Sequence, residues 1–330
     1  MKIVVIGGGS WGTALATVVA AKGQGVTIWV RGADMAREIN EQHTNTRYLP
    51  GQTLPLAVQA DTDLEAVLHG ADCIVLAVPC QFLGAVLRAH AHLFPDQPRI
   101  LCASKGLELG TLRTMRQVVE QELADCGPRY AMLSGPSFAA EVVAQMPTAV
   151  TLGCADAELA EFGQNLFSTE MFRVYANADV TGVELGGAVK NIMAIAAGIA
   201  DGLGFGQNAR AALITRGLSE MSRLGVALGG QAQTFMGLSG MGDLVLTCTG
   251  DLSRNRRVGL ALGQGKKLHD ILAGMHNVAE GVKTTQAVHA LGKSLGIELP
   301  ITAQVHAVLF EDKNPAHAVR ELMTRPLREE

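Results

Sequence analysis

Lys190 is the residue whose surroundings most clearly suggest chemistry, because residues 186–198 around it are otherwise almost wholly small and apolar. In a helix, these glycines and alanines would allow close packing and would carry the lysine into the interior or onto the floor of a cleft. Desolvation lowers the pKa of a lysine and makes it a usable acid or base. The segment alone leaves a second interpretation open, in which Lys190 reaches the surface or pairs with a carboxylate such as Glu184.

Three further polar groups could contribute to the same chemistry. Lys105 precedes a glycine and follows an apolar stretch, so its charge would face a cleft, although a loop lysine in solvent fits equally well. Asp243 opens an apolar run, either as a functional carboxylate or as an ordinary helix N-cap. Ser253, Arg254 and Asn255 begin a helical stretch whose amides, dipole and guanidinium could hold a phosphate or carboxylate. A capped helix with an exposed basic first turn is the alternative there.

A glycine motif near the start of the chain predicts a dinucleotide site. Residues 2–6 form a β-branched strand, and the motif GxGxxG follows it, ahead of helix-compatible residues 13–20. Gly7 permits the turn, Gly9 lets the backbone approach a pyrophosphate, and Gly12 lets helix and strand pack closely. The amides at the helix start then point at the phosphate. A tight glycine turn with no ligand is the alternative.

Arg31 predicts the choice of cofactor. It follows the second expected strand, residues 26–30, at a place where a fold selecting NAD would usually have Asp or Glu. A guanidinium there could pair with the 2′-phosphate of NADP, so we expect NADPH to be preferred, with NADH possible. Asp34 lies nearby and would moderate the preference. The alternative is an arginine that is merely solvated.

The elements that must position these residues indicate an α/β domain followed by an all-helical domain. Strands alternate with amphipathic helices in the first half, which predicts a doubly wound, mostly parallel, Rossmann-like sheet. From residue 180 onward, helical segments broken by glycine-rich turns take over. We therefore expect a dinucleotide-binding domain over residues 1–180 and a helical substrate-binding domain over residues 181–330. The later strands are expected at 73–78, 99–103, 130–133 and 148–152, and amphipathic helices at 81–93 and 112–123.

Composition limits the class of protein. The 330 residues carry 27 Lys and Arg against 31 Asp and Glu, for a net charge of -4, so no basic field recruits nucleic acid or anionic lipid. The six cysteines are scattered without metal-ligand spacing, which predicts reduced thiols and no metal site. A secretory signal at the N-terminus is an alternative, but glycines interrupt its apolar stretch. No uninterrupted apolar stretch approaches the ~18 residues that span a bilayer, so we expect a soluble, cytoplasmic protein without membrane insertion.

Seven ordered segments resemble the bacterial NAD(P)-dependent glycerol-3-phosphate dehydrogenases and extend over essentially the whole chain. The resemblance implies an enzyme that reduces dihydroxyacetone phosphate to glycerol 3-phosphate for phospholipid synthesis. One departure is Gly8, where many relatives have alanine, and it touches only the glycine turn. The segments are residues 7–16, 104–106, 134–139, 187–191, 242–244, 253–256 and 278–281.

The resemblance also implies roles for individual residues. Hydride would pass from NADPH to C2 of the ketone, Lys190 would donate a proton to the C2 oxygen, and Lys105 would stabilise the developing charge. Asp243 would orient Lys190 or a substrate hydroxyl. The implied cofactor contacts are Ser10, Trp11, Arg31, Lys105, Ala139, Arg254, Val278 and Glu280, and the implied substrate contacts are Lys105, Gly135, Ser137, Lys190, Asn191, Asp243, Ser253, Arg254 and Asn255.

Two further functions remain open from the sequence. One is a different two-domain NAD(P)-dependent dehydrogenase, acting on hydroxyacids or hydroxyacyl thioesters, which would need different chemistry in its second domain. The second is a non-catalytic NADPH-sensing protein, for which Lys105, Lys190 and Asp243 would have no use. A homodimer formed through the apolar helices is also plausible.

Overall fold

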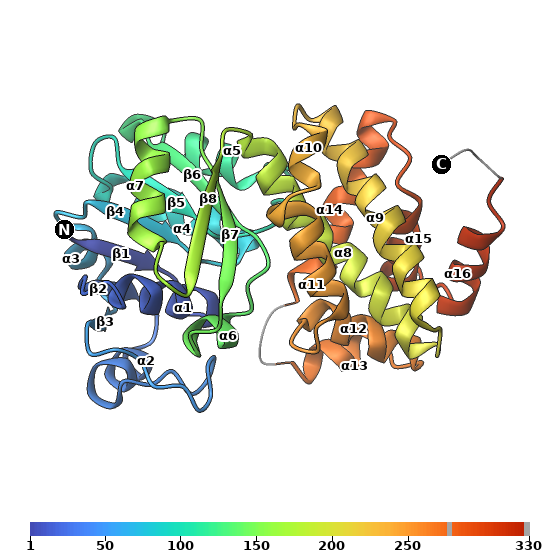
Figure 1. The fold of residues 1–330 in the computed structure, drawn as a ribbon, viewed down its shortest axis with the longest axis horizontal. Helices are drawn as coiled ribbons and strands as arrows, with labels where there is room; N and C mark the ends of the chain where they lie inside the picture. The colour runs from blue at the N-terminus through green and yellow to red at the C-terminus, as the bar shows by residue number, and fades with distance from the viewer. Residues whose placement is uncertain (276–278, 327–330) are drawn as a thin grey trace.

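The computed structural model describes residues 1–275 and 279–326, and it arranges them as a sheet-containing region followed by a helical region. Figure 1 shows the two regions side by side, with the strands and their covering helices in one half and the helices from α8 onward in the other. The last strand ends at Asn177 and α8 begins at Val180. The α/β plus all-α architecture expected from the sequence is confirmed.

An eight-stranded sheet organises the first region, in the order β3-β2-β1-β4-β5-β6-β7-β8. Neighbouring strands are parallel except β6 and β7, which are antiparallel. The central strands β1 and β4 are wholly buried, as strands covered on both faces must be. The strands are β1 (Ile3–Ile6), β2 (Val26–Trp29), β3 (Val58–Asp61), β4 (Cys73–Leu76), β5 (Arg99–Cys102), β6 (Arg129–Ser134), β7 (Thr148–Gly153) and β8 (Phe172–Asn177).

Helices cover both faces of this sheet. On one face, α1, α6 and α7 contribute residues such as Leu15 and Phe167 to a buried apolar cluster. On the other face, α3, α4 and α5 contribute Leu83 and Val118 to a second cluster. The helices of this region are α1 (Ser10–Ala20), α2 (Ala33–Arg37), η1 (Glu38–Gln42), α3 (Leu64–Leu68), α4 (Cys80–His90), η2 (Ala91–Leu93), α5 (Met115–Glu122), η3 (Ala124–Cys126), α6 (Ala139–Val143) and α7 (Ala157–Phe167).

Two strands, β3 and β8, were not expected from the sequence, and both lie at the edges of the sheet. In β3 the exposed Gln59 and Asp61 alternate with buried residues, and in β8 the exposed Arg173 and Tyr175 do the same. A strand open to water on one face lacks the continuous apolar run that marks the central strands. The remaining six strands lie where the sequence predicted them, with ends that differ by one or two residues.

Helix α8 (Val180–Gly202) is the core of the second region, and almost all of its residues are buried. It is long and apolar enough to cross a membrane, but its most apolar window is 100% buried inside the protein. Glycines bring it close to α12: a Cβ at Gly198 would lie 2.0 Å from the carbonyl oxygen of Arg256, and a Cβ at Gly259 would lie 2.0 Å from that of Ile195. The remaining helices are α9 (Gln207–Ala227), α10 (Ala232–Phe235), η4 (Leu238–Gly242), α11 (Asp243–Thr249), α12 (Arg254–Gly263), α13 (Leu268–Ala273), α14 (Glu280–Leu295), α15 (Pro300–Phe310) and α16 (Pro315–Met323).

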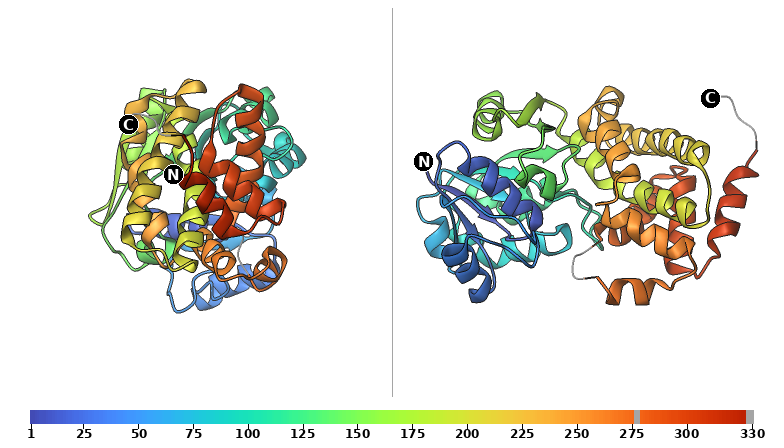
Figure 2. Two further views of the ribbon diagram at one scale, coloured as in Figure 1. Left: turned by 90° about the vertical axis from the view of Figure 1, so that its right-hand side faces the viewer. Right: turned by 60° about the horizontal axis from the view of Figure 1, so that its bottom comes forward.

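Helix α8 also connects the two regions. Its N-terminus is capped by Asp179, whose carboxylate accepts hydrogen bonds from the backbone N–H groups of Gly182 and Gln231, both at 2.8 Å. The helix packs against β6 and β7 as well as against α9, α11, α12 and α14. Figure 2 shows the helical region adjoining one side of the sheet region. Lys190, in the middle of α8, is therefore carried to the junction.

Candidate active site

Lys105, Lys190 and Asp243 meet at this junction. Lys105 follows β5, Lys190 lies in α8, and Asp243 is the first residue of α11. The Lys105 Nζ donates a hydrogen bond to Asp243 Oδ2 at 2.9 Å, and the Lys190 Nζ donates one to Asp243 Oδ1. One carboxylate thus holds two ammonium groups beside each other. The cluster adjoins the carboxyl end of a parallel strand, which is where folds of this kind bind ligands.

Burial sets the protonation behaviour of the cluster. Lys190 is 8% exposed and Asp243 is 1% exposed. Burial lowers the pKa of Lys190 to about 8, against the opposing effect of the Asp243 charge and with a further lowering by Lys105. Burial alone would raise the pKa of Asp243, but the two ammonium groups outweigh it and hold that pKa below its ordinary value. Lys190 can therefore exchange a proton near neutral pH while Asp243 stays ionised.

Thr247 is a further contact of Lys190 and belongs to none of the motifs described above. The Lys190 Nζ donates a hydrogen bond to Thr247 Oγ1 at 2.9 Å, and that hydroxyl donates to the backbone oxygen of Asp243 at 2.6 Å. The available signal was the four-residue spacing from Asp243, which places both side chains on one side of α11. The hydroxyl fixes the direction in which the Lys190 amine points.

Glu184, which the sequence left open as a partner of Lys190, does not pair with it, and the carboxylate that does is Asp243. The Glu184 Oε1 accepts hydrogen bonds from the Tyr130 hydroxyl at 2.7 Å and from the backbone N–H of Arg116 at 2.8 Å. Burial raises the pKa of Glu184 to about 7, against the lowering effect of these hydrogen bonds. The carboxyl group ties α8 to β6 and α5 rather than neutralising the lysine.

Asp243 is not a helix cap, and Lys105 is not a loop lysine in solvent. Both oxygens of the Asp243 carboxylate bind lysine ammonium groups, and the residue lies inside α11, after Gly242. The side chain of Lys105 is only 12% exposed. The sequence predicted a cleft beside Lys105 and a functional role as one interpretation of Asp243, and only the fold shows that the two side chains bind each other.

The loop after β6 faces Lys105. The Lys105 Nζ donates a hydrogen bond to the backbone oxygen of Gly135 at 3.3 Å, and the Ser137 hydroxyl donates to the same oxygen at 3.0 Å. Gly135 has φ +145°, and a Cβ there would lie 2.9 Å from the Cα of Val150, so only glycine fits. Ala139 is the first residue of α6, and it packs against the buried apolar cluster to which α1 also contributes.

The start of α12 is built as the sequence predicted, with Ser253 as its cap. The backbone N–H of Arg256 donates to the Ser253 hydroxyl at 3.2 Å. Asn255 Nδ2 donates to Asn191 Oδ1 at 2.9 Å, and Asn255 Oδ1 accepts from the backbone N–H of Gly281 at 3.0 Å. Asn255 thereby joins α8, α12 and α14 at the edge of the lysine cluster.

Arg254, at the start of α12, and Glu280, at the start of α14, carry opposite charges. Arg254 is only partly exposed, so the expectation of an open basic first turn is wrong for this residue. Burial lowers the pKa of Arg254 while the charge of Glu280 raises it. Burial raises the pKa of Glu280, opposed first by Arg254 and more weakly by Lys105 and Lys190. Val278, which the resemblance assigns to the cofactor site, lies outside the described residues.

The glycine turn has the geometry that a bound pyrophosphate requires. Gly7 has φ +121°, and a Cβ there would lie 2.8 Å from the carbonyl oxygen of Ala77. A Cβ at Gly12 would lie 2.0 Å from the carbonyl oxygen of Gly7, whereas a Cβ at Gly9 would meet nothing within 4 Å. Helix α1 begins at Ser10 with no side-chain cap and no acidic residue in its first turn. Its first amides are therefore free for an anion.

Asn45 holds this turn in place, although no motif in the sequence marks it. Its Nδ2 donates hydrogen bonds to the backbone oxygen of Gly8 at 3.0 Å and to Thr13 Oγ1 at 2.9 Å. Both Asn45 and Thr13 are 0% exposed. The contact joins positions 37 residues apart, so no local pattern could reveal it.

Trp11 and Arg31 present groups that the protein itself does not use. The Trp11 indole N–H is buried and has no hydrogen-bond partner among the described residues. Arg31 is exposed just after β2, and no described residue forms an ion pair with it. A buried donor without a partner is unfavourable unless a bound molecule accepts its hydrogen bond. With the open side of Gly9, these groups fit a dinucleotide.

The cysteines form neither a disulfide nor a metal site among the described residues. All six are free, and every one except Cys126 is buried, as the sequence predicted for reduced core thiols. Burial raises the pKa of Cys73 and of Cys248 to about 12, so both stay protonated at neutral pH. Within residues 1–275 and 279–326, no group of three or more His, Cys, Asp or Glu side chains could hold a metal ion.

A Rossmann-like sheet with an open glycine turn, followed by a helical region that brings a buried lysine to the strand ends, defines a dinucleotide-dependent oxidoreductase. Two family models identify the family of oxidoreductases to which the chain belongs. The model described as the NAD-dependent glycerol-3-phosphate dehydrogenase N-terminus matches residues 2–160, and the corresponding C-terminus model matches residues 179–320. The chain belongs to the NAD-dependent glycerol-3-phosphate dehydrogenase family.

Individual relatives agree with this assignment over all or nearly all of their length. The chain is 61% identical over 330 residues to an NAD(P)+ glycerol-3-phosphate dehydrogenase of Solidesulfovibrio magneticus, covering 100% of both chains. It is 52% identical over 333 residues to the enzyme of the same name from Geobacter sulfurreducens, covering 100% of this chain and 98% of the other. The crystal structure of glycerol-3-phosphate dehydrogenase from Coxiella burnetii superimposes with a TM-score of 0.94 at 46% identity, covering 98% of this chain and 99% of that one.

Proposed function

We propose that this chain interconverts dihydroxyacetone phosphate and sn-glycerol 3-phosphate with a nicotinamide dinucleotide, with Lys190 as the proton donor and acceptor. The observation that carries the proposal is the hydrogen-bonded cluster of Lys105, Asp243 and Lys190 at the junction of the two regions. Membership of the family supports the same reaction.

Lys190 performs the proton transfer in this scheme. When bound, the cofactor supplies a hydride to C2 of the ketone. The carbonyl oxygen gains the electron pair of the broken π bond and takes a proton from the Lys190 ammonium group. Lys105 stabilises the negative charge as it grows on that oxygen. In the reverse direction, neutral Lys190 accepts the proton of the alcohol, which its pKa of about 8 permits close to neutral pH.

Asp243 and Thr247 position the two lysines. Asp243 gives each ammonium group one carboxylate oxygen, so neither side chain can rotate freely. Positioned donors of this sort are commonly worth a few kcal/mol in the transition state. Thr247 adds a second hydrogen bond to Lys190.

The phosphate end of the substrate is assigned to the start of α12. Ser253, Arg254 and Asn255 supply a helix N-terminus, a guanidinium and an amide there. Asn191, in α8, is hydrogen bonded to Asn255 and extends these proposed substrate contacts from α12 to α8. Gly135 and Ser137 complete the substrate contacts on the opposite side, beside Lys105.

The cofactor is assigned to the glycine turn, with Ser10 and Trp11 at the start of α1 and with Ala139 and Glu280 beside the reacting end. We infer that NADPH is preferred over NADH, because Arg31 is exposed, lacks a partner among the described residues and follows β2. Arg31→Ala should raise the KM for NADPH by about tenfold and leave the KM for NADH nearly unchanged. Equal effects on both cofactors would remove the argument for NADPH.

The cellular setting is inferred from the same reaction. Glycerol 3-phosphate made in this way would enter phospholipid synthesis, and we infer a cytoplasmic location. We also propose that the chain forms a homodimer through its helical region. We propose further that residues 1–180 form a dinucleotide-binding domain and residues 181–330 a substrate-binding domain.

One assay separates the proposed reaction from a hydroxyacid-type dehydrogenase and from an NADPH sensor. Oxidation of NADPH is followed on adding dihydroxyacetone phosphate, and separately on adding 2-oxoacids or 3-oxoacyl thioesters. We expect turnover with the triose phosphate only, and its loss by at least about a hundredfold in Lys190→Ala. Turnover with an oxoacid alone would favour the hydroxyacid-type enzyme, and cofactor binding without any turnover would favour a sensor. A folded Lys190→Ala enzyme with near-normal activity would exclude Lys190 as the proton donor.

A further inference from the structure

Arg256 directly follows the three residues at the start of α12 that are assigned to the substrate phosphate, but its own side chain is bound within the protein. Its Nε donates a hydrogen bond to Asp201 Oδ2 at 2.8 Å, and its Nη1 donates one to Asp251 Oδ1 at 2.8 Å. The side chain is only 13% exposed. The guanidinium is therefore committed to two carboxylates, and what it can contribute is the position of the first turn of α12.

Asp201 is the partner of Arg256 that can fix this turn. It lies near the C-terminal end of α8, and its side chain is 7% exposed, whereas the side chain of Asp251 is 95% exposed. Breaking a buried ion pair is strongly unfavourable, while an exposed pair is screened by water and contributes little. Asp201 Oδ1 also accepts two hydrogen bonds from Arg210 of α9, at 2.6 and 3.1 Å. One carboxylate thus joins α8, α9 and α12.

The backbone of Arg256 lies where α8 and α12 touch. A Cβ at Gly198 would lie 2.0 Å from the Arg256 carbonyl oxygen, so the two helices meet backbone to backbone there. The Arg256 backbone N–H donates to the Ser253 hydroxyl and so closes the cap of α12. Gly198 and Asp201 are three residues apart on α8 and share one face of that helix. The same stretch of α8 therefore contacts both the backbone and the side chain of Arg256.

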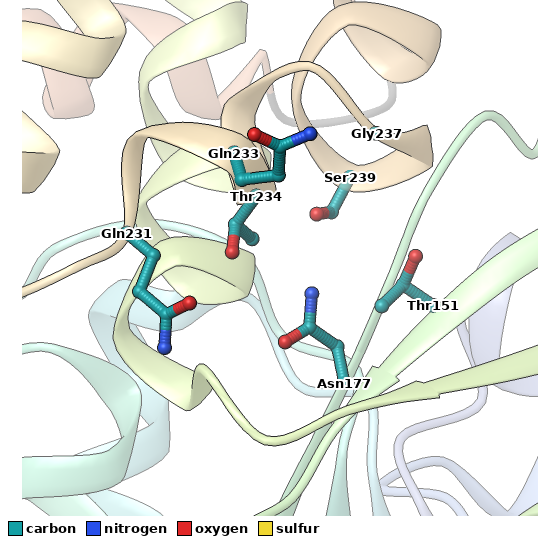
Figure 3. A pocket seen from close by; sticks show the side chains of 7 residues that line it. All are labelled: Thr151, Asn177, Gln231, Gln233, Thr234, Gly237 and Ser239. Atoms are coloured by element: carbon teal, nitrogen blue, oxygen red, sulfur yellow. The ribbon is translucent and has the colours of Figure 1, made fainter.

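Helix α8 is a fixed support for this turn, because its opposite end is also bound. The Asp179 carboxylate accepts hydrogen bonds there from the backbone N–H groups of Gly182 and Gln231, both at 2.8 Å. Figure 3 shows the pocket at this end, which Gln231 from the helical region and Asn177 from the end of β8 both line. Between its ends, almost all residues of α8 are buried. Loss of the contact at Asp201 would therefore displace α12 rather than α8.

We propose that Asp201 is a positioning residue for the phosphate end of the substrate, and that it acts through Arg256 without touching the substrate itself. The inference rests on the proposed function, in which the start of α12 binds the phosphate. Asn255 has its own contacts to Asn191 and Gly281, so the effect falls mainly on Arg254 and on the first amides of the helix. A displacement of ~1 Å at such groups can cost up to about a hundredfold. The two lysines are held separately, by Asp243, so the chemical step is unaffected.

Steady-state kinetics with two ketones tests the proposal. Dihydroxyacetone phosphate carries the phosphate, and dihydroxyacetone is the same ketone without it. Asp201→Asn should raise the KM for the phosphate ester about tenfold, keep its kcat within about twofold, and leave kcat/KM for dihydroxyacetone unchanged. Equal losses with both ketones, in a chain whose wild type reduces the phosphate ester, would overturn this inference alone. A wild-type chain that does not reduce the phosphate ester would refute the proposed function, and the inference with it.

A double-mutant cycle shows whether Asp201 acts through Arg256. Arg256→Met removes the guanidinium and should raise the same KM about tenfold, and combining it with Asp201→Asn should add nothing further. Arg256→Met leaves Asp201 paired with Arg210, so it provides the test even where Asp201→Asn is too unstable to purify, and a wild-type KM in Arg256→Met would overturn the proposal.

Two control variants separate positioning from general stability. Arg210→Met removes the other partner of Asp201, whose side chain is 20% exposed, and leaves α12 untouched, so it should lower Tm without changing the KM for the phosphate ester. Asp251→Asn removes only the exposed partner of Arg256 and should raise that KM no more than about twofold. A KM raised as much by Arg210→Met as by Arg256→Met would show a general loss of stability and overturn the proposal.

Discussion

Asp243→Asn tests how the lysine cluster works. The Asp243 carboxylate lies 2.9 Å from the Lys105 Nζ and is directly hydrogen bonded to the Lys190 Nζ. Asparagine keeps the size and one acceptor oxygen but removes the negative charge. Both ammonium groups then lose their counter-charge, and their mutual repulsion is no longer balanced. The protonated form of Lys190 should become less favourable.

The magnitude follows from the distance and the burial. Coulomb's law at the 2.9 Å between Lys105 and Asp243, with an effective dielectric constant of about 20, gives an attraction of about 6 kcal/mol, and the attraction on the directly hydrogen-bonded Lys190 is at least as large. Observed pKa shifts caused by one neighbouring opposite charge are smaller, about 1 to 3 units, because water and dipoles compensate. The pKa of Lys190 is about 8 in the native chain and should fall to about 6 in the variant. At about pH 7.5 the protonated fraction then falls roughly 25-fold.

The assay is the pH dependence of kcat for ketone reduction. Reduction needs protonated Lys190, so the rate of the wild-type enzyme should decline as pH rises through about 8, and that of Asp243→Asn as pH rises through about 6. Asp251→Asn is the control, because that carboxylate is exposed and pairs with Arg256 at 2.8 Å, away from the lysines. Identical pH midpoints in Asp243→Asn and the wild type would refute the assignment of the titrating group to Lys190.

The same substitution should lower stability. Removing one partner of a buried ion pair typically costs about 3–5 kcal/mol, because the remaining charge is left without compensation. Urea unfolding should show the full loss at about pH 5, where Lys190 is protonated in both chains. The loss should shrink as pH rises through about 6 to 8, and the contribution of Lys190 should vanish above about pH 9, where this lysine is neutral in both chains. A loss that does not depend on pH would point to packing rather than charge.

Three further predictions concern groups outside the cluster. The pKa of Glu184 is raised to about 7 in the fold, so its contribution to stability is present below its ordinary pKa and is lost as pH rises through about 7. Glu184→Gln should therefore abolish about 3 kcal/mol of the decline between about pH 5 and pH 8 in urea unfolding, and an unchanged decline would exclude Glu184 as its source. Asn45→Ala removes one hydrogen bond to the Gly8 carbonyl of the glycine turn and one to the Thr13 hydroxyl in α1, and it should raise the KM for the cofactor about tenfold without altering the KM for the triose phosphate. Gly9→Ala places a Cβ in open space and should weaken cofactor binding while leaving Tm unchanged, whereas Gly12→Ala forces a contact with the Gly7 carbonyl and should lower both. Equal Tm values for these two variants would contradict the assigned roles of the glycines.

Local sequence patterns were sufficient to predict the central strands of the sheet and the glycine turn. β1 and β4 are buried apolar runs, and the glycine turn between β1 and α1 has a characteristic spacing. The edge strands β3 and β8 lack such runs because water covers one of their faces. The small-residue pattern around Lys190 indicated burial as one of two interpretations, and Lys190 is indeed buried, since glycine and alanine allow the close packing of α8 against its neighbours.

The sequence could not predict which residues the functional side chains would bind. Lys190 was expected to be buried, but the candidate carboxylate nearest in sequence, Glu184, bonds to Tyr130 instead. Asp243 is 53 residues from Lys190, and Asn45 is 37 residues from the turn that it supports. A hydrogen bond between distant segments depends on how helices and strands pack, and no residue periodicity records that packing.

The sequence by itself determined that this chain folds as a nucleotide-binding sheet followed by helices, because the period of its apolar residues and the spacing of its glycines are local properties. It also determined which residues carry charge in apolar surroundings. Only the tertiary structure decided that Lys105 and Lys190 share one carboxylate, and that the pKa of Lys190 falls to about 8. Desolvation and charge pairing depend on everything that surrounds a group, and for Lys190 those surroundings come from α8, α11 and the end of β5 together.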